Sequence, residues 1–359
     1  MFRPFGAACT RFSTVANWKT LQRNGDISMI QIPQGFRLAA ANADFRGKHL
    51  DRNDLSLVYS DAPATVAGVF TTNLFRAAPV LISQENIRNA GDRGVRGVIF
   101  NSGQANACTG EQGRENCLRT LDMVSEALRR EGENVRADEL LPASTGVIGA
   151  QMDMHRWAVT VPSLVKALGS VDLEGLARAM MTTDAFPKMA GRELSLAGGT
   201  VRLAGVAKGA GMICPNMATM LALVMCDASV EPSAWRAMFR RAVDATFNRV
   251  SVDGDTSTND SLYGLANGAS GVTVRTEELP LLETALTEVL GELAYMLVKD
   301  GEGATKVMHI HVTGAACNED AEKVARTVGH SQLVKTAMFG RDPNWGRIVA
   351  AAGRAGVDF

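Results

Sequence analysis

The chain has 359 residues, a formal net charge of −1 at pH 7, and 46% hydrophobic against 21% charged residues. A chain of this size and composition buries a full core and has room for two domains. Its basic residues are scattered and its net charge is close to zero, which gives no electrostatic basis for nucleic-acid binding. The longest apolar runs are far shorter than the ~20 residues of a membrane span. We therefore expect small-molecule partners, with no nucleic acid and no membrane.

Cysteine and histidine usage argues against a metal site. The six cysteines contain no CxxC pair, and the five histidines have no ligand spacing to them, which favours a reduced compartment. His309 and His311 would share one face of a strand, but a catalytic zinc usually takes three protein ligands. We expect no metal.

Residues 1–25 contain four basic residues, Arg3, Arg11, Lys19 and Arg23, and no acidic residue. An acid-poor leader with arginines and hydroxyls resembles an organelle transit peptide, and it lacks the apolar segment of a secretion signal. This pattern predicts the mitochondrial matrix as the location. The cytoplasm is the alternative if the segment is only a frayed terminus or an expression scar.

Between residues 32 and 100 the sequence predicts short strands at close spacing. The segments are 32–41, 55–59, 66–72, 79–83 and 97–100, with a turn at 61–63. Alternating apolar residues and the turn residues between the segments support these assignments. Strands of this length and spacing favour a mixed or antiparallel sheet.

Residues 101–110 follow the last of these strands and are rich in amides and hydroxyls. They form either an active-site loop or an Asx-type turn that caps the next helix. That helix is predicted from an apolar stripe formed by Cys117, Leu121, Val124 and Leu128.

Residues 141–149 form a turn-rich segment in which Thr145 precedes Gly146. Consecutive backbone N–H groups beside a glycine can form a nest for a developing oxyanion, although most such turns are only turns.

The rest of the chain predicts mostly helices. In order, these are a helix over 173–181, a hairpin around 198–199, a helix from about 232, a helix over 282–299, a strand over 306–312, a helix over 321–328 and a polar loop over 340–347. Residues 251–261 combine Asp, Thr and Asn without the full EF-hand arrangement. They favour a hydroxyl-rich turn over a calcium loop.

The stretch 205–227 is the strongest candidate for chemistry. A glycine-rich loop with Lys208 leads to Thr219, which opens an apolar run over 220–225. Three interpretations are open: a phosphate-binding loop, although the GxxxxGK[ST] pattern is absent; a structural turn before a buried strand; and self-cleavage before Thr219. A threonine hydroxyl is a poor nucleophile, but a freed α-amino group with a pKa near ~8 is a base built into the same residue.

Seven motifs in chain order carry a family resemblance. They are NSGQANACTG, ASTGVIG, MTTD, KGAGMICPNMATMLALV, VSVDGDTSTND, DGEGATK and GRDPNWGR. Together they closely resemble the ornithine acetyltransferase family of arginine-biosynthesis bifunctional proteins, from about residue 32 to residue 359. The resemblance implies an α/β (α+β) fold: a layered helix–sheet–sheet–helix sandwich of the DmpA/ornithine acetyltransferase type with a smaller C-terminal α/β domain.

The resemblance also implies that a precursor cleaves itself between Ala218 and Thr219. Residues 26–218 would form the α chain, 219–280 the part of the β chain that completes the N-terminal core, and 281–359 the C-terminal domain. Paired chains would assemble as α2β2. Because family members continue beyond GRDPNWGR for longer than this chain does, the C-terminal domain is expected to be truncated here.

By the same resemblance, Thr219 takes acetyl from N-acetylornithine and passes it to glutamate through an acetyl-threonine intermediate. The oxyanion hole would be made by Thr145 and Gly146. The substrate would be contacted by Thr182, Lys208 and Glu302. No cofactor is implied, with acetyl-CoA as a second candidate acetyl donor.

Two other functions remain open from the sequence. One is an N-terminal-nucleophile aminopeptidase of a related fold, which would release amino acids from peptides without needing glutamate. The other is an inactive, truncated binding or scaffold homologue, which would bind ornithine or glutamate without transferring acetyl.

Overall fold

The described part of the chain is built around one long strand, β2 (Leu55–Phe70). The structure is a computed structural model, and it describes residues 30–47, 51–214 and 220–358. The strands are β1 (Phe36–Ala41), β2 (Leu55–Phe70), β3 (Val95–Gln104), β4 (Leu140–Val147), β5 (Lys188–Leu196), β6 (Gly199–Lys208), β7 (Leu221–Cys226) and β8 (Ser261–Ala266). The helices are α1 (Ala78–Ala90), α2 (Gly110–Arg130), α3 (Met154–Lys166), α4 (Leu173–Met180), α5 (Pro232–Ala245), α6 (Leu279–Lys299), α7 (Asn318–Gly329), α8 (Gln332–Gly340) and α9 (Trp345–Ala352).

The 16-residue strand β2 joins two sheets. The strand order is β4-β3-β2-β8-β7-β6-β5, with β1 also paired to β2. The first half of β2 pairs antiparallel with β1 and β3, its register against β3 shifts between Tyr59 and Ala64, and its second half pairs antiparallel with β8. Because β3 and β4 are parallel in the first sheet and β7 and β8 are parallel in the second, both sheets are mixed.

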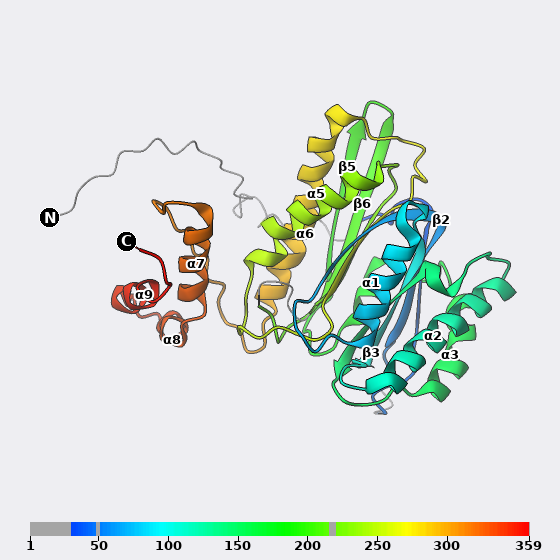
Figure 1. The fold of residues 1–359 in the computed structure, drawn as a ribbon, viewed down its shortest axis with the longest axis horizontal. Coiled ribbons are helices and arrows are strands. Elements are labelled where there is room, and N and C mark those ends of the chain that lie inside the picture. Colours follow the sequence, from blue (N-terminus) through cyan, green and yellow to red (C-terminus); the bar gives the residue numbers. More distant parts are fainter. Residues whose placement is uncertain (1–29, 48–50, 215–219, 359) are drawn as a thin grey trace.

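Alternating side chains along the strands divide the core into layers. Leu57 packs beneath α2 and α3, whereas its neighbour Val58 lies in the core between the two sheets. In the second sheet, Leu223 joins the same central core and Val224 packs against α5 and α6. Figure 1 shows α2 and α3 together on one side of the strands and α5 and α6 on another. The predicted helix–sheet–sheet–helix sandwich is therefore confirmed.

Two predictions near the start of the chain are wrong for local reasons. β2 continues through residues 61–63, where the sequence predicts a turn, because the register shift lets the strand change partners without reversing. Residues 79–83 lie in α1 rather than in a strand. Pro79 lies in the first helical turn, where a backbone N–H has no acceptor within the helix, so a proline costs no hydrogen bond there. So short an apolar run cannot show a helical period.

The predicted hairpin and the two long helices that follow it are confirmed. β5 and β6 form the predicted hairpin, closing at the pair Leu196 and Gly199. Helix α5 begins at Pro232, and α6 covers the predicted range 282–299. The prediction of a turn-rich segment over 141–149 is corrected. Most of this segment is the strand β4, which pairs in a parallel ladder with β3.

The last three helices have a small core of their own. It is formed by Val324, Val328, Val334 and Ala351. Figure 1 shows α7, α8 and α9 beside the sandwich. The predicted domain limit at residue 281 falls inside α6, whose apolar side packs on the second sheet. Among the described residues, no helix is long and apolar enough to cross a membrane.

Two further predictions in this region are corrected. Residues 306–312 are not a strand, because none of the described strands pairs with them. The polar loop predicted over 340–347 is reduced to 341–344, because α8 extends to Gly340 and α9 begins at Trp345.

Candidate active site

The predicted oxyanion residues lie at the end of β4. Because β4 runs parallel to β3, Thr145 lies opposite Ser102 and Gly146 opposite Gly103. Thr145 is buried, whereas Gly146 is exposed. Gly146 has a φ of +133°, and a Cβ there would lie 2.2 Å from the carbonyl carbon of Gly103, so only glycine fits this position. The strand end therefore places a hydroxyl beside an open stretch of backbone.

Lys208 ends β6 and reaches this strand end from the second sheet. Its Nζ donates a hydrogen bond to Thr145 Oγ1 at 3.1 Å, and its side chain is buried. Burial lowers the pKa of Lys208; the carboxylate of Asp184 opposes this effect and the charge of Lys188 adds to it. Since Thr145 Oγ1 already accepts a hydrogen bond, the threonine proton can be donated to a substrate oxygen.

Asp184 links two of the predicted substrate contacts. Thr182 follows the end of α4, and its amide donates to Asp184 Oδ2 at 2.8 Å. The amide of Gly209, next to Lys208, donates to Asp184 Oδ1 at 2.6 Å. Burial alone would raise the pKa of Asp184, but the charges of Lys208 and Lys188 and the hydrogen bonds lower it to about 2. Asp184 is therefore ionised at neutral pH and connects α4 to β6.

Glu302 reaches the same region from the end of α6. Its amide donates to the carbonyl of Ala210 at 2.9 Å, and a Cβ on Gly211 would lie 2.9 Å from Glu302 Oε1. The carboxylate thus lies against the glycine loop that follows Lys208, and the residue is exposed. The structure therefore brings Lys208 into direct contact with Thr145, and it connects Glu302 to the same loop through backbone.

The predicted cleavage pair, Ala218 and Thr219, lies outside the described residues. The first described residue after it is Met220, whose amide donates to Asp260 Oδ1 at 3.0 Å. Asp260 is fully buried. Burial raises the pKa of Asp260 well above its usual value, although the Met220 amide and the charge of Lys208 oppose this. Sequence reasoning missed Asp260, because it lies within the hydroxyl-rich turn and its partner is 40 residues away.

In the two polar segments, residues 251–261 and 101–110, side chains form hydrogen bonds with backbone groups. Asp253 accepts the amides of Met212 and Ile213 at 2.5 and 2.9 Å, which matches a turn and not a calcium loop. Asn106 Nδ2 donates to the carbonyl of Gly113 at 2.9 Å, and its Oδ1 accepts from Thr109 Oγ1 at 2.7 Å. These bonds brace the first turn of α2, but they are not the predicted Asx-type cap, because the N-cap residue Thr109 makes no side-chain cap hydrogen bond. Within the described ranges, no group of three or more His, Cys, Asp or Glu side chains is placed to hold a metal ion.

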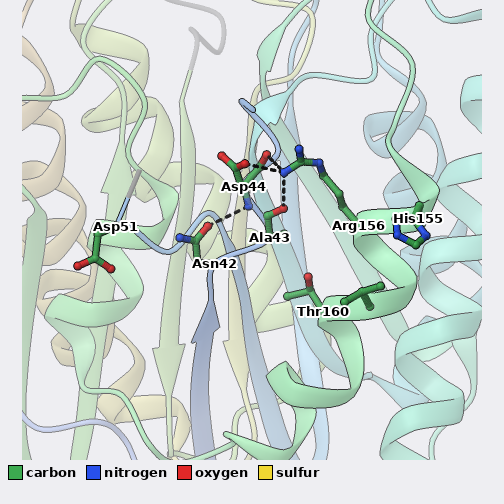
Figure 2. A pocket seen from close by; sticks show the side chains of 8 residues that line it. Asn42, Ala43, Asp44, Asp51, His155, Arg156 and Thr160 are labelled. Atoms are coloured by element: carbon green, nitrogen blue, oxygen red, sulfur yellow. Dashed lines mark hydrogen bonds and ion pairs between the residues drawn. The ribbon is translucent and has the colours of Figure 1, made fainter. Parts of the chain in front are cut away.

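A separate surface pocket of about 550 Å³ lies beside α3 and is lined by none of the predicted site residues. Figure 2 shows Arg156 reaching across it to Asp44 and the carbonyl of Ala43. The guanidinium pairs with Asp44 Oδ2 at 2.8 Å and with Asp153 at 3.1 Å. Because the charge of Arg156 is already paired, the described residues that line the pocket offer no open cation, and we assign it no function.

The fold and the site together define the class of protein. It is a layered α/β sandwich in which a hydroxyl, a lysine and carboxylates from several strand and helix ends converge. The ArgJ family matches residues 37–359, and the chain belongs to this family. The membership confirms the resemblance that the seven motifs carry.

Similar proteins bear the name "Arginine biosynthesis bifunctional protein ArgJ". One from Nitratidesulfovibrio vulgaris is 62% identical over 91% of this chain and 81% of its own length. One from Geobacter sulfurreducens is 48% identical over 90% of this chain and 81% of its own length. These proteins are bacterial, which gives no support to the predicted mitochondrial location.

Solved structures of similar proteins also exist. An ornithine acetyltransferase complexed with ornithine from Mycobacterium tuberculosis is 36% identical and covers 51% of this chain and 92% of its own, with a TM-score of 0.46. An arginine biosynthesis bifunctional protein from Bacillus halodurans is 31% identical and covers 52% of this chain and 92% of its own, with a TM-score of 0.47.

Proposed function

We propose that this chain is a self-cleaving acetyltransferase of arginine biosynthesis, which moves acetyl from N-acetylornithine to glutamate. Membership of the ArgJ family supports the reaction class. The observation that carries the proposal is the buried hydrogen bond from Lys208 Nζ to Thr145 Oγ1, because it orients a hydroxyl at the end of β4. A hydroxyl fixed beside the backbone of an exposed glycine, here Gly146, suits the stabilisation of the oxyanion of acyl transfer.

In this proposal the Thr219 hydroxyl attacks the acetyl carbonyl, and its proton passes to the α-amino group that cleavage after Ala218 sets free. Thr145 and Gly146 donate to the oxyanion as the tetrahedral intermediate forms. Collapse of the intermediate releases ornithine, whose amine takes up the proton, and leaves an acetyl ester on Thr219. The amine of glutamate then attacks the ester and carries the acetyl group away. Such a ping-pong reaction needs no cofactor, and acetyl-CoA is a second candidate donor.

The charged groups of the site suit amino-acid substrates. The exposed carboxylate of Glu302 can hold the ammonium group of ornithine, since it lies against the glycine loop with its charge open to solvent. Thr182 and Lys208 contribute hydrogen-bond donors from the neighbouring element ends. We propose these three residues as substrate contacts.

The test is intact-mass measurement of the purified protein before and after incubation with N-acetylornithine. We expect two fragments, the second beginning at Thr219, and one acetyl adduct on that fragment which glutamate removes. Thr219→Ala should stay uncut and inactive, whereas the matched variant Thr219→Ser keeps a hydroxyl and should still be cut. A single uncut chain that transfers acetyl would show that the proposed mechanism is wrong.

The same samples separate the alternatives. Release of amino acids from peptides without glutamate would point to the aminopeptidase. A cleaved chain that transfers no acetyl, yet melts at a higher temperature with ornithine, would point to the binding homologue. We further propose the cytoplasm as the location, which the bacterial relatives support, and an α2β2 assembly, which light scattering can check.

A further inference from the structure

Lys188 lies at the start of β5 between two carboxylates. Its Nζ contacts Asp184 Oδ1 at 2.7 Å and Asp300 Oδ2 at 2.5 Å, and all three side chains are buried or nearly so. The third partner of the ammonium group is the carbonyl of Phe186, at 3.5 Å. Removing such charges from water costs free energy that the ion pairs often only just offset. Stability alone is therefore a weak reason for this cluster.

One end of the cluster holds two predicted substrate contacts in place. Asp184 accepts the amide of Thr182 and the amide of Gly209, which follows Lys208. These amides belong to different elements, the end of α4 and the end of β6. A carboxylate that accepts both fixes the distance between Thr182 and Lys208.

The other end of the cluster holds the third contact. Asp300 caps the end of α6, and its two oxygens accept the amide of Ala185 at 3.2 and 3.0 Å. Glu302 follows two residues later and is tied by its own amide to Ala210. Since Lys188 bridges Asp184 and Asp300, it couples the end of α6 to the ends of α4 and β6.

We infer that Lys188, Asp184 and Asp300 form a positioning cluster, which sets the relative positions of Thr182, Lys208 and Glu302 and thereby the affinity for the amino-acid substrate. The inference rests on the proposed function, because that function assigns the three contacts. No member of the cluster needs to touch the substrate. A displaced group loses its hydrogen bond to the substrate, and a hydrogen bond that involves a charged group contributes roughly tenfold or more to affinity.

The test compares Lys188→Met and Asp300→Asn with wild type in the full, self-cleaved protein. Asp300→Asn is the milder variant, because an asparagine oxygen can still accept the Ala185 amide while the charge facing Lys188 is lost. We expect the KM for N-acetylornithine to rise roughly ten- to hundredfold, with a smaller change in kcat. The Kd for N-acetylornithine, measured by calorimetry, should rise by a similar factor.

Arg192→Met is the matched control. Arg192 lies on the same strand and pairs with Glu288 at 2.8 Å and with Glu292, both on the same helix α6. It ties β5 to α6 as Lys188 does, but its ion pairs join none of the substrate contacts. Its KM and Kd should stay close to wild type even if its melting temperature falls.

The outcomes separate the two proposals. If wild type transfers acetyl and Asp300→Asn keeps the wild-type KM and Kd, or if Arg192→Met changes them equally, the positioning role is wrong. If wild type binds N-acetylornithine but transfers no acetyl, the proposed function fails and the Kd values still decide the positioning role. If wild type does neither, both fail. If Lys188→Met does not fold, Asp300→Asn decides alone.

Discussion

At the end of β4, the hydroxyl of Thr145 accepts from Lys208 and is free to donate its own proton. We expect Thr145→Val, which keeps the shape and removes the hydroxyl, to lower kcat by about 10²- to 10³-fold, the usual loss for one oxyanion donor. Thr145→Ser restores the hydroxyl and should keep most of the activity. Steady-state acetyl transfer measures both, and a valine variant with wild-type kcat would remove Thr145 from the oxyanion hole.

How far the sequence predicts the site depends on how far apart the interacting residues are in the chain. The motifs mark Thr145 and Lys208 as candidates, but only the fold shows that their side chains meet across 63 residues. Asp300 and Lys188 interact across 112 residues. No motif contains both, and a buried lysine is indistinguishable from a surface lysine in the sequence. The resemblance therefore supplies the contacts, and the structure supplies what holds them.

Among the elements, the predictions that fail are those in which a distant partner decides the local structure. The segment 61–63 carries turn residues, yet it stays extended because β2 passes from one sheet to the other there. Residues 141–147 are rich in turn formers, but pairing with β3 makes them a strand. Helices α2, α5 and α6 are predicted correctly, because a helix forms its hydrogen bonds locally and its apolar stripe is visible in the sequence.

The contact between β8 and α5 gives a prediction about packing. Gly264 of β8 lies under Phe239 of α5, and a Cβ there would lie 2.4 Å from Phe239 Cε2. Trp235 also donates to the carbonyl of Gly264 at 3.1 Å, so the helix cannot easily lift away. We expect Gly264→Ala to lower the free energy of unfolding by about 1–3 kcal/mol, the usual cost of overpacking.

Thermal melting is the measurement for this variant, with Gly340→Ala as its control. Gly340 ends α8, and a Cβ there would meet nothing within 4 Å. The control should melt at the wild-type temperature or slightly above, since alanine favours the helix over glycine. Equal melting of Gly264→Ala and wild type would mean that α5 can move away from β8 at little cost.

At the scale of the whole molecule, the small unit of α7–α9 contacts residues 248–252 of the sandwich, and its His330 Nε2 also lies 3.7 Å from Cys214 Sγ in the loop after β6. Arg326 donates to the carbonyl of Asn248 at 2.6 Å, and Lys335 donates to the carbonyl of Val252 at 2.7 Å. The amide of Val252 in turn donates to the carbonyl of Ile213 at 2.7 Å. The unit is thereby coupled to the loop that follows β6 and carries the proposed cleavage site.

This coupling predicts where the molecule loosens when the attachment is weakened. A hydrogen bond from a charged donor contributes about 1.5–3 kcal/mol, so Lys335→Met should raise amide exchange at Val252 by roughly tenfold or more, without raising it in the β5–β6 hairpin. Lys323→Met is the control, because Lys323 pairs within its own helix α7, with Asp320 at 3.1 Å. Hydrogen exchange read by mass spectrometry measures both. Unchanged exchange at Val252 would show that the hydrogen bond from Lys335 does not hold this segment.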